Sequence, residues 1–157
     1  MVDLSVQLGP ITLRSPITLA SGTAGYGTEL AALTSLDKLG AVFTKALTVH
    51  PRPGHAPPRG REVEAGLINR IGLQNVGLPV FLEQKLPALR ATGLPGIANL
   101  AGASEGEFVE LAGALSDRDG LIGLELNVSC PNVDHGGIEF GRDAGTLQSL
   151  VATVRTV

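Results

Sequence analysis

The only cysteine of the chain, Cys130, lies in the segment NVSCPN at residues 127–132. A thiol can titrate near working pH once its surroundings adjust it, so Cys130 could act as a nucleophile or a general base. Pro131 stiffens the turn after it, and Asn127 and Asn132 bring amide donors and acceptors to a small polar ligand. The alternative is a structural cysteine, because free cysteines often pack as small buried hydrophobic residues.

Several other polar residues share one position in the predicted elements, at or just past the carboxyl end of an apolar segment. They are Ser21, Lys45, Asn99 and Asn127, in addition to Cys130. Parallel α/β folds build their sites at the carboxyl ends of the strands, so these side chains are expected to converge. Taken alone, Lys45 could equally be a solvated loop residue. Two amides and a cation suit a flat heterocycle with mixed donors and acceptors better than they suit a metal.

The histidines and the glycine-rich segment give little indication of a metal or phosphate site. His50, His55 and His135 show no spacing typical of metal ligands, and we predict no metal site. The glycine-rich segment at 22–27 matches neither the dinucleotide-binding fingerprint nor the P-loop pattern.

The elements that must position these residues alternate between apolar strands and amphipathic helices. We predict a β-hairpin from 4–7 and 11–14, strands at 16–20, 40–44, 95–100 and 121–127, and helices at 28–38, 77–91, 104–117 and 143–157. A proline-rich excursion at 48–66 reads as a long irregular loop. Strand–helix alternation of this kind indicates a parallel sheet. Its four β-α units form either half of an eight-fold barrel or a small open sheet.

Composition limits the class of protein. Hydrophobic residues make up 43% and charged residues 17% of the 157 residues, which allows one domain with a sizeable core. The net charge of −3 gives no case for nucleic acid or an anionic membrane surface. The single cysteine excludes an internal disulfide and suits a reducing cytoplasm, where we expect the protein to act. The sequence shows neither a signal peptide nor a membrane-spanning segment.

The motifs together carry a family resemblance. The chain resembles the N-terminal half of a class 1 dihydroorotate dehydrogenase, a flavoenzyme of pyrimidine biosynthesis. The motifs that carry the resemblance are ASGTAGYG (20–27), TKALT (44–48), NRIGLQN (69–75), the Asn at 99 and ELNVSCPN (125–132). The continuation VDHGGIEFG (133–141) is more similar to the class 1B branch, which uses NAD through a partner subunit.

The resemblance implies a fold and a set of site residues. The fold would be an N-terminal hairpin plus the first four β-α units of a TIM (β/α)8 barrel, with residues 1–157 as the N-terminal half and the C-terminal half absent. The implied FMN contacts are Ser21, Lys45, Ala46, Asn99 and Asn127. The implied substrate contacts are Lys45, Asn69, Arg70, Ile71, Gly72, Leu73, Asn127 and Asn132.

The resemblance also implies a reaction, in which dihydroorotate is oxidised to orotate. Cys130 matches the family's base, which removes a proton from C5 while a hydride leaves C6 for the flavin N5. The implied partners are a second copy of the chain and an electron-transfer subunit that carries FAD and a 2Fe–2S cluster. Because the phosphate-binding loops of such barrels follow strands seven and eight, the isolated chain is expected to bind FMN weakly. Two alternatives stay open, a flavin domain similar to dihydropyrimidine dehydrogenase and a half barrel without catalysis.

Overall fold

The computed structural model describes residues 2–31, 33, 35–128 and 137–157. Its centre is a parallel sheet of β3 (Thr18–Leu19), β4 (Ala41–Phe43), β7 (Gly96–Leu100) and β8 (Leu121–Leu126). The strands lie side by side in the order in which they follow one another along the chain. A doubly wound sheet reverses its strand order at a switch point, whereas a barrel does not. The chain therefore has four consecutive strands of a TIM barrel, as predicted.

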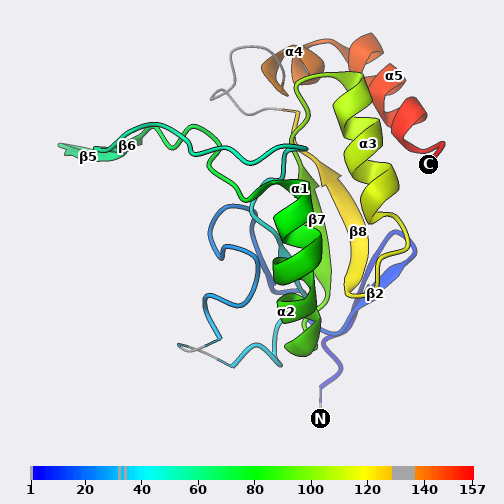
Figure 1. The fold of residues 1–157 in the computed structure, drawn as a ribbon. Coiled ribbons are helices and arrows are strands. Elements are labelled where there is room, and N and C mark those ends of the chain that lie inside the picture. The colour runs from blue at the N-terminus through cyan, green and yellow to red at the C-terminus, as the bar shows by residue number, and fades with distance from the viewer. Residues whose placement is uncertain (1, 32, 34, 129–136) are drawn as a thin grey trace.

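Helices follow three of these strands and cover one face of the sheet (Figure 1). After β4 comes a continuous helical run of α1 (Gly77–Val80), the π-helical η1 (Phe81–Lys85) and α2 (Leu86–Ala91). After β7 comes α3 (Glu105–Leu115), and after β8 come α4 (Gly137–Arg142) and α5 (Ala144–Val154). The helix α3 begins with reciprocal capping bonds, since the Ser104 hydroxyl accepts from the Glu107 amide and the Glu107 carboxylate accepts from the Ala103 amide.

The core is divided between the two faces of the sheet. On the helical face, Ala98 and Leu100 of β7 pack with Phe81, Phe108 and residues of α3 and α5. The other face is covered at its lower end by the predicted hairpin, β1 (Val6–Leu8) and β2 (Ile11–Leu13), through a cluster that includes Leu13, Ala41 and Ile97. The hairpin thus covers the amino ends of the strands, which leaves their carboxyl ends for a site.

The predicted helix at 28–38 is wrong for the residues that the structure describes there, which form consecutive turns. Their hydrogen bonds run from an amide to the carbonyl three residues earlier, at Ala31 and at Leu33. The Glu29 carboxylate accepts from the amides of Tyr26 and Thr28. Leu33 is 81% exposed, so it does not contribute to a buried helix face.

The proline-rich excursion is more regular than predicted. It ends in an antiparallel hairpin of β5 (Gly60–Val63) and β6 (Gly66–Asn69), which projects away from the rest of the chain (Figure 1). The pairing sets Arg61 beside Ile68 and Glu62 beside Leu67, and every residue of both strands is exposed. With no buried face, the segment lacks the alternation of apolar and polar residues that identifies a strand in sequence.

Within the described part of the chain, no helix is both long enough and apolar enough to cross a membrane.

Candidate functional site

A cavity of about 190 Å³ lies at the carboxyl ends of the four parallel strands. Its wall combines residues that follow β3, β4 and β8 with one residue of β7 and part of the segment before α1. The residues that line it are Ser21, Gly22, Lys45, Ala46, Ile71, Leu73, Gln74, Asn99 and Asn127. The structure therefore brings together all five predicted cofactor contacts and two of the predicted substrate segment, Ile71 and Leu73. Their roles in binding stay predictions.

The main chain around Lys45 is fixed by the neighbouring elements. The Lys45 amide donates to the Gly25 carbonyl at 2.6 Å, and the Leu47 amide donates to the Asn99 carbonyl at 2.8 Å. The buried Thr44 hydroxyl accepts a hydrogen bond from the backbone amide of Asn99 at 3.1 Å. These bonds extend the pairing of β4 and β7 beyond the strands, so Lys45 and Asn99 hold fixed positions at the cavity wall.

The side-chain amides of Asn99 and Asn127 are hydrogen-bonded to each other. The Asn127 Nδ2 group donates to Asn99 Oδ1 at 3.3 Å. The Asn99 Nδ2 group donates in turn to the carboxylate of Glu125, its partner in the register of β7 and β8. Sequence reasoning missed Glu125, although a carboxylate in the otherwise apolar strand LIGLEL was the signal that could have identified it.

The predicted substrate segment at 69–73 is split between two environments. Asn69 and Arg70 are exposed at the base of the projecting hairpin and do not line the cavity, whereas Gly72 is buried beside it. Leu73 lines the cavity with a left-handed backbone, φ +54°, which costs a residue with a Cβ about 1–2 kcal/mol. Such strain persists only where the surroundings impose it.

Asn75 imposes the path of this segment and was not recognised from sequence. The residue is 6% exposed, and its side chain makes five hydrogen bonds, two of them with the Thr48 hydroxyl. The Oδ1 atom accepts from the amides of Gly77 at 2.8 Å and Thr48 at 3.3 Å. The Nδ2 group donates to the Thr48 hydroxyl and to the Leu73 carbonyl, each at 2.9 Å. Asn75 therefore joins the start of the excursion, at Thr48, to the segment 73–77 that leads into α1.

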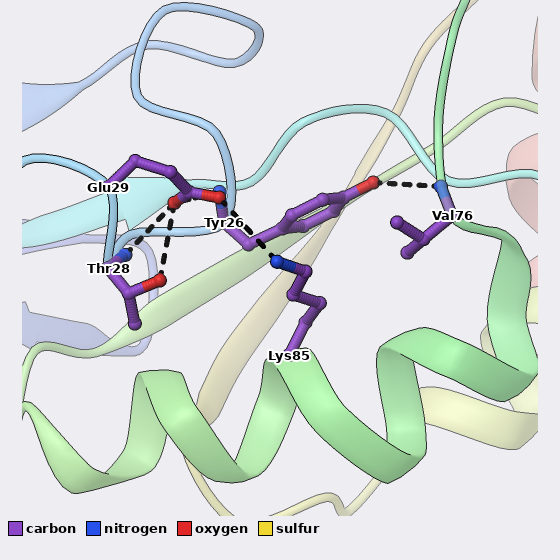
Figure 2. A network of polar contacts seen from close by, with 5 residues as sticks. All are labelled: Tyr26, Thr28, Glu29, Val76 and Lys85. Carbon is purple, nitrogen blue, oxygen red and sulfur yellow. Dashed lines mark hydrogen bonds and ion pairs between the residues drawn. The ribbon is translucent and has the colours of Figure 1, made fainter. Parts of the chain in front are cut away.

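The loop that carries Ser21 is held by a network around Tyr26, drawn in Figure 2. The Tyr26 hydroxyl accepts from the Val76 amide at 3.2 Å, and the Lys85 ammonium lies 5.5 Å from the centre of the Tyr26 ring. Lys85 also lies 4.0 Å from the Glu29 carboxylate, which accepts from the amides of Tyr26 and Thr28. Burial raises the pKa of Tyr26, and the negative charge of Glu29 adds to the rise, whereas the hydrogen bond from Val76 opposes it.

A second, smaller cavity of about 140 Å³ adjoins the first and shares Leu73 and Asn127 with it. His50 and Arg52 bring basic groups to its wall, and Glu107 brings a carboxylate.

Two predicted residues, Cys130 and Asn132, lie outside the described residues. Among the residues that are described, no group of three or more His, Cys, Asp or Glu side chains could hold a metal ion. The first cavity instead offers an ammonium group, a hydroxyl and amides between the apolar side chains of Ala46, Ile71 and Leu73. This combination can hold a flat heterocycle by its polar edge and by its faces.

Comparison with known proteins identifies relatives along almost the whole chain. The sequence profile of the family described as Dihydroorotate dehydrogenase matches residues 3–157. A protein of Geobacter metallireducens named "Dihydroorotate dehydrogenase B (NAD(+)), catalytic subunit" is 47% identical over 153 residues, which is 98% of this chain and 50% of the relative. A protein of the same name from Trichlorobacter lovleyi is 46% identical over 152 residues, 97% of this chain and 50% of the relative. The chain thus spans about half the length of these relatives.

Solved structures agree on the fold. The dihydroorotate dehydrogenase of Eimeria tenella in complex with ferulenol superposes with a TM-score of 0.74 at 21% identity, covering 98% of this chain and 43% of that protein. The ligand-free form of the same enzyme gives a TM-score of 0.74 at 20% identity, over 98% of this chain and 45% of that protein.

Proposed function

Because this chain belongs to the dihydroorotate dehydrogenase family, we propose that it forms the N-terminal half of a barrel that oxidises dihydroorotate to orotate in pyrimidine biosynthesis. The observation that carries the proposal is the shared cavity wall. Lys45, Asn99 and Asn127 come from three adjacent strands and meet at the carboxyl ends of the sheet. An ammonium group beside two amides suits a pyrimidine ring that carries a carboxylate and ring amides.

We propose that the same cavity also contacts the ring of FMN. Ile71, Leu73 and Ala46 offer apolar contact, and Ser21, Asn99 and Asn127 offer hydrogen bonds to the polar edge of the ring. A bound FMN would supply the hydride acceptor. Its phosphate would be held by later β-α units of the kind that the longer relatives carry, since barrels commonly bind phosphate after strands seven and eight.

In the proposed reaction, the chain's own residues orient the substrate and take its proton. The Cys130 thiolate would accept a proton from C5 of dihydroorotate while the hydride leaves C6, so that the ring C5–C6 bond becomes double. Lys45, Asn127 and Asn132 would hold the substrate in the correct orientation, with the segment from Asn69 to Leu73 closing over it.

We propose the partners from the names of the relatives and from the family. The relatives are named as catalytic subunits of an NAD(+) enzyme, which supports a partner subunit. From the family resemblance we propose that this partner transfers electrons through FAD and a 2Fe–2S cluster, and that the catalytic chain pairs with a second copy. A cytoplasmic location is in keeping with the single cysteine and with a small polar substrate.

The proposal is tested by flavin retention and reduction. Two samples are compared after FMN addition and desalting, the 157-residue chain and the same chain extended by the C-terminal half of the Geobacter metallireducens relative. We expect the extended protein to stay yellow and to bleach with anaerobic dihydroorotate, while the chain alone loses most of its flavin. A Cys130→Ser variant of the extended protein should stay yellow and bleach much more slowly.

Other results would favour the alternatives. Faster bleaching by dihydrouracil than by dihydroorotate would indicate an enzyme similar to dihydropyrimidine dehydrogenase. An extended protein that retains FMN and is not reduced by either compound would indicate a barrel without this activity. Loss of FMN from the extended protein would contradict the proposed cofactor site.

A further inference from the structure

Glu125 is a carboxylate in β8, the edge strand of the parallel sheet. The other five residues of β8 are glycine or apolar, and Glu125 is partly buried beside its register partner Asn99 of β7. A carboxylate removed from water is costly unless it is hydrogen-bonded. Its hydrogen-bond donor is the Nδ2 group of Asn99, a residue that is 3% exposed and lines the cavity.

The carboxylate fixes the direction of the hydrogen bonds that follow. A carboxylate can only accept, whereas an asparagine amide can turn to present either its oxygen or its nitrogen. Asn99 must therefore direct Nδ2 toward Glu125, which directs Oδ1 toward Asn127. Asn127 must then donate its own Nδ2 group to Asn99. This chain of bonds does not use the Asn127 amide oxygen.

We propose that Glu125 is a positioning residue, which sets the direction of the Asn99–Asn127 hydrogen bond and so makes the Asn127 amide oxygen available as an acceptor at the cavity. The ligand group that such an acceptor recognises is a ring N–H. This identification of the ligand rests on the proposed function, since FMN and dihydroorotate both carry ring N–H groups. The direction of the hydrogen bonds is a property of the chain itself and does not depend on that function.

The Glu125→Gln variant tests the direction of the hydrogen bonds without a large change in side-chain packing. It has nearly the size of glutamate, but its amide can donate as well as accept, so the Asn99 amide is no longer held in one orientation. Glu110 on α3 provides the matched control, since it is exposed and Glu110→Gln changes the net charge by the same amount.

The test is NMR of the chain labelled with ¹⁵N only in its five asparagines. In the Glu125→Gln variant, we expect the side-chain amide signals of Asn99 and Asn127 to move. Hydrogen exchange at the Asn99 amide should accelerate on the order of tenfold, because hydrogen bonds to charged acceptors are the stronger ones. The signals of Asn75, whose network is separate, should stay in place. Asn99 and Asn127 signals that change no more than in Glu110→Gln would overturn the proposal.

A measurement on the unsubstituted chain does not depend on how the variant folds. Nuclear Overhauser contacts from the Asn99 side-chain amide protons to the Glu125 Cγ protons are expected, and so are contacts from the Asn127 amide protons to Asn99. Asn99 amide protons that instead contact Asn127 and not Glu125 would refute the direction. Failure of the extended protein to retain FMN would count against the proposed function, whereas these contacts decide the role of Glu125.

Discussion

Replacing Asn75 by alanine should destabilise the chain more than any change at an exposed asparagine. The side chain makes five hydrogen bonds to four partner groups, and each partner contributes roughly 1 kcal/mol net. In the Asn75→Ala variant, the amides of Thr48 and Gly77 and the Leu73 carbonyl lose that partner at a site that is 6% exposed. The sum of these losses is about 3–5 kcal/mol.

The assay is thermal and urea unfolding followed by circular dichroism. For a domain of this size, 1 kcal/mol corresponds to roughly 2–4 °C in Tm, so we expect Tm to fall by about 10 °C. Asn69→Ala is the matched control, since Asn69 is exposed at the end of β6 and should change stability by less than about 0.5 kcal/mol. Because Asn75 and Thr48 share bonds, the effects of Asn75→Ala and Thr48→Val should not add. A loss below about 1 kcal/mol for Asn75→Ala, or one equal to that of the control, would refute this account of the segment.

Two further predictions concern glycine and tyrosine. Gly72 and Gly22 both have left-handed backbones, φ +74° and +80°, but an added Cβ would lie 2.7 Å from the His55 amide nitrogen at Gly72 and within 4 Å of nothing at Gly22. Gly22→Ala should therefore cost about 1–2 kcal/mol in urea unfolding, and Gly72→Ala clearly more; equal losses would contradict the steric argument. Tyr26 is the only tyrosine, so absorbance at alkaline pH reports its ionisation alone, and the midpoint should lie above the ordinary pKa near 10. Because the folded state holds this proton more tightly than the unfolded state, stability should be intact below about pH 10 and fall as pH rises through the raised pKa, a loss that Tyr26→Phe should abolish.

The cavity wall was predictable because it depends on strand ends. Ser21, Lys45 and Asn127 each follow a short apolar segment, and the parallel pairing of those segments brings the side chains together whatever the intervening loops do. The absence of the predicted helix at 28–38 could not be foreseen from local spacing alone. The Glu29 carboxylate binds the amides of Tyr26 and Thr28 there, and the chain forms turns in place of a helix.

The residues that sequence reasoning missed act through partners that are distant in sequence. Asn75 has its main contacts at Thr48, and Glu125 has its contact at Asn99. Neither partner is visible from local spacing, because Asn99 and Glu125 meet only when β7 and β8 pair, and Thr48 meets Asn75 only when the excursion folds back. The predicted residues line the cavity, whereas Asn75 and Glu125 do not line it and instead bind residues that do. A search for functional residues in this fold should therefore include buried polar side chains that contact the cavity wall, and Glu125 is the first candidate because its charge admits only one direction of hydrogen bonding.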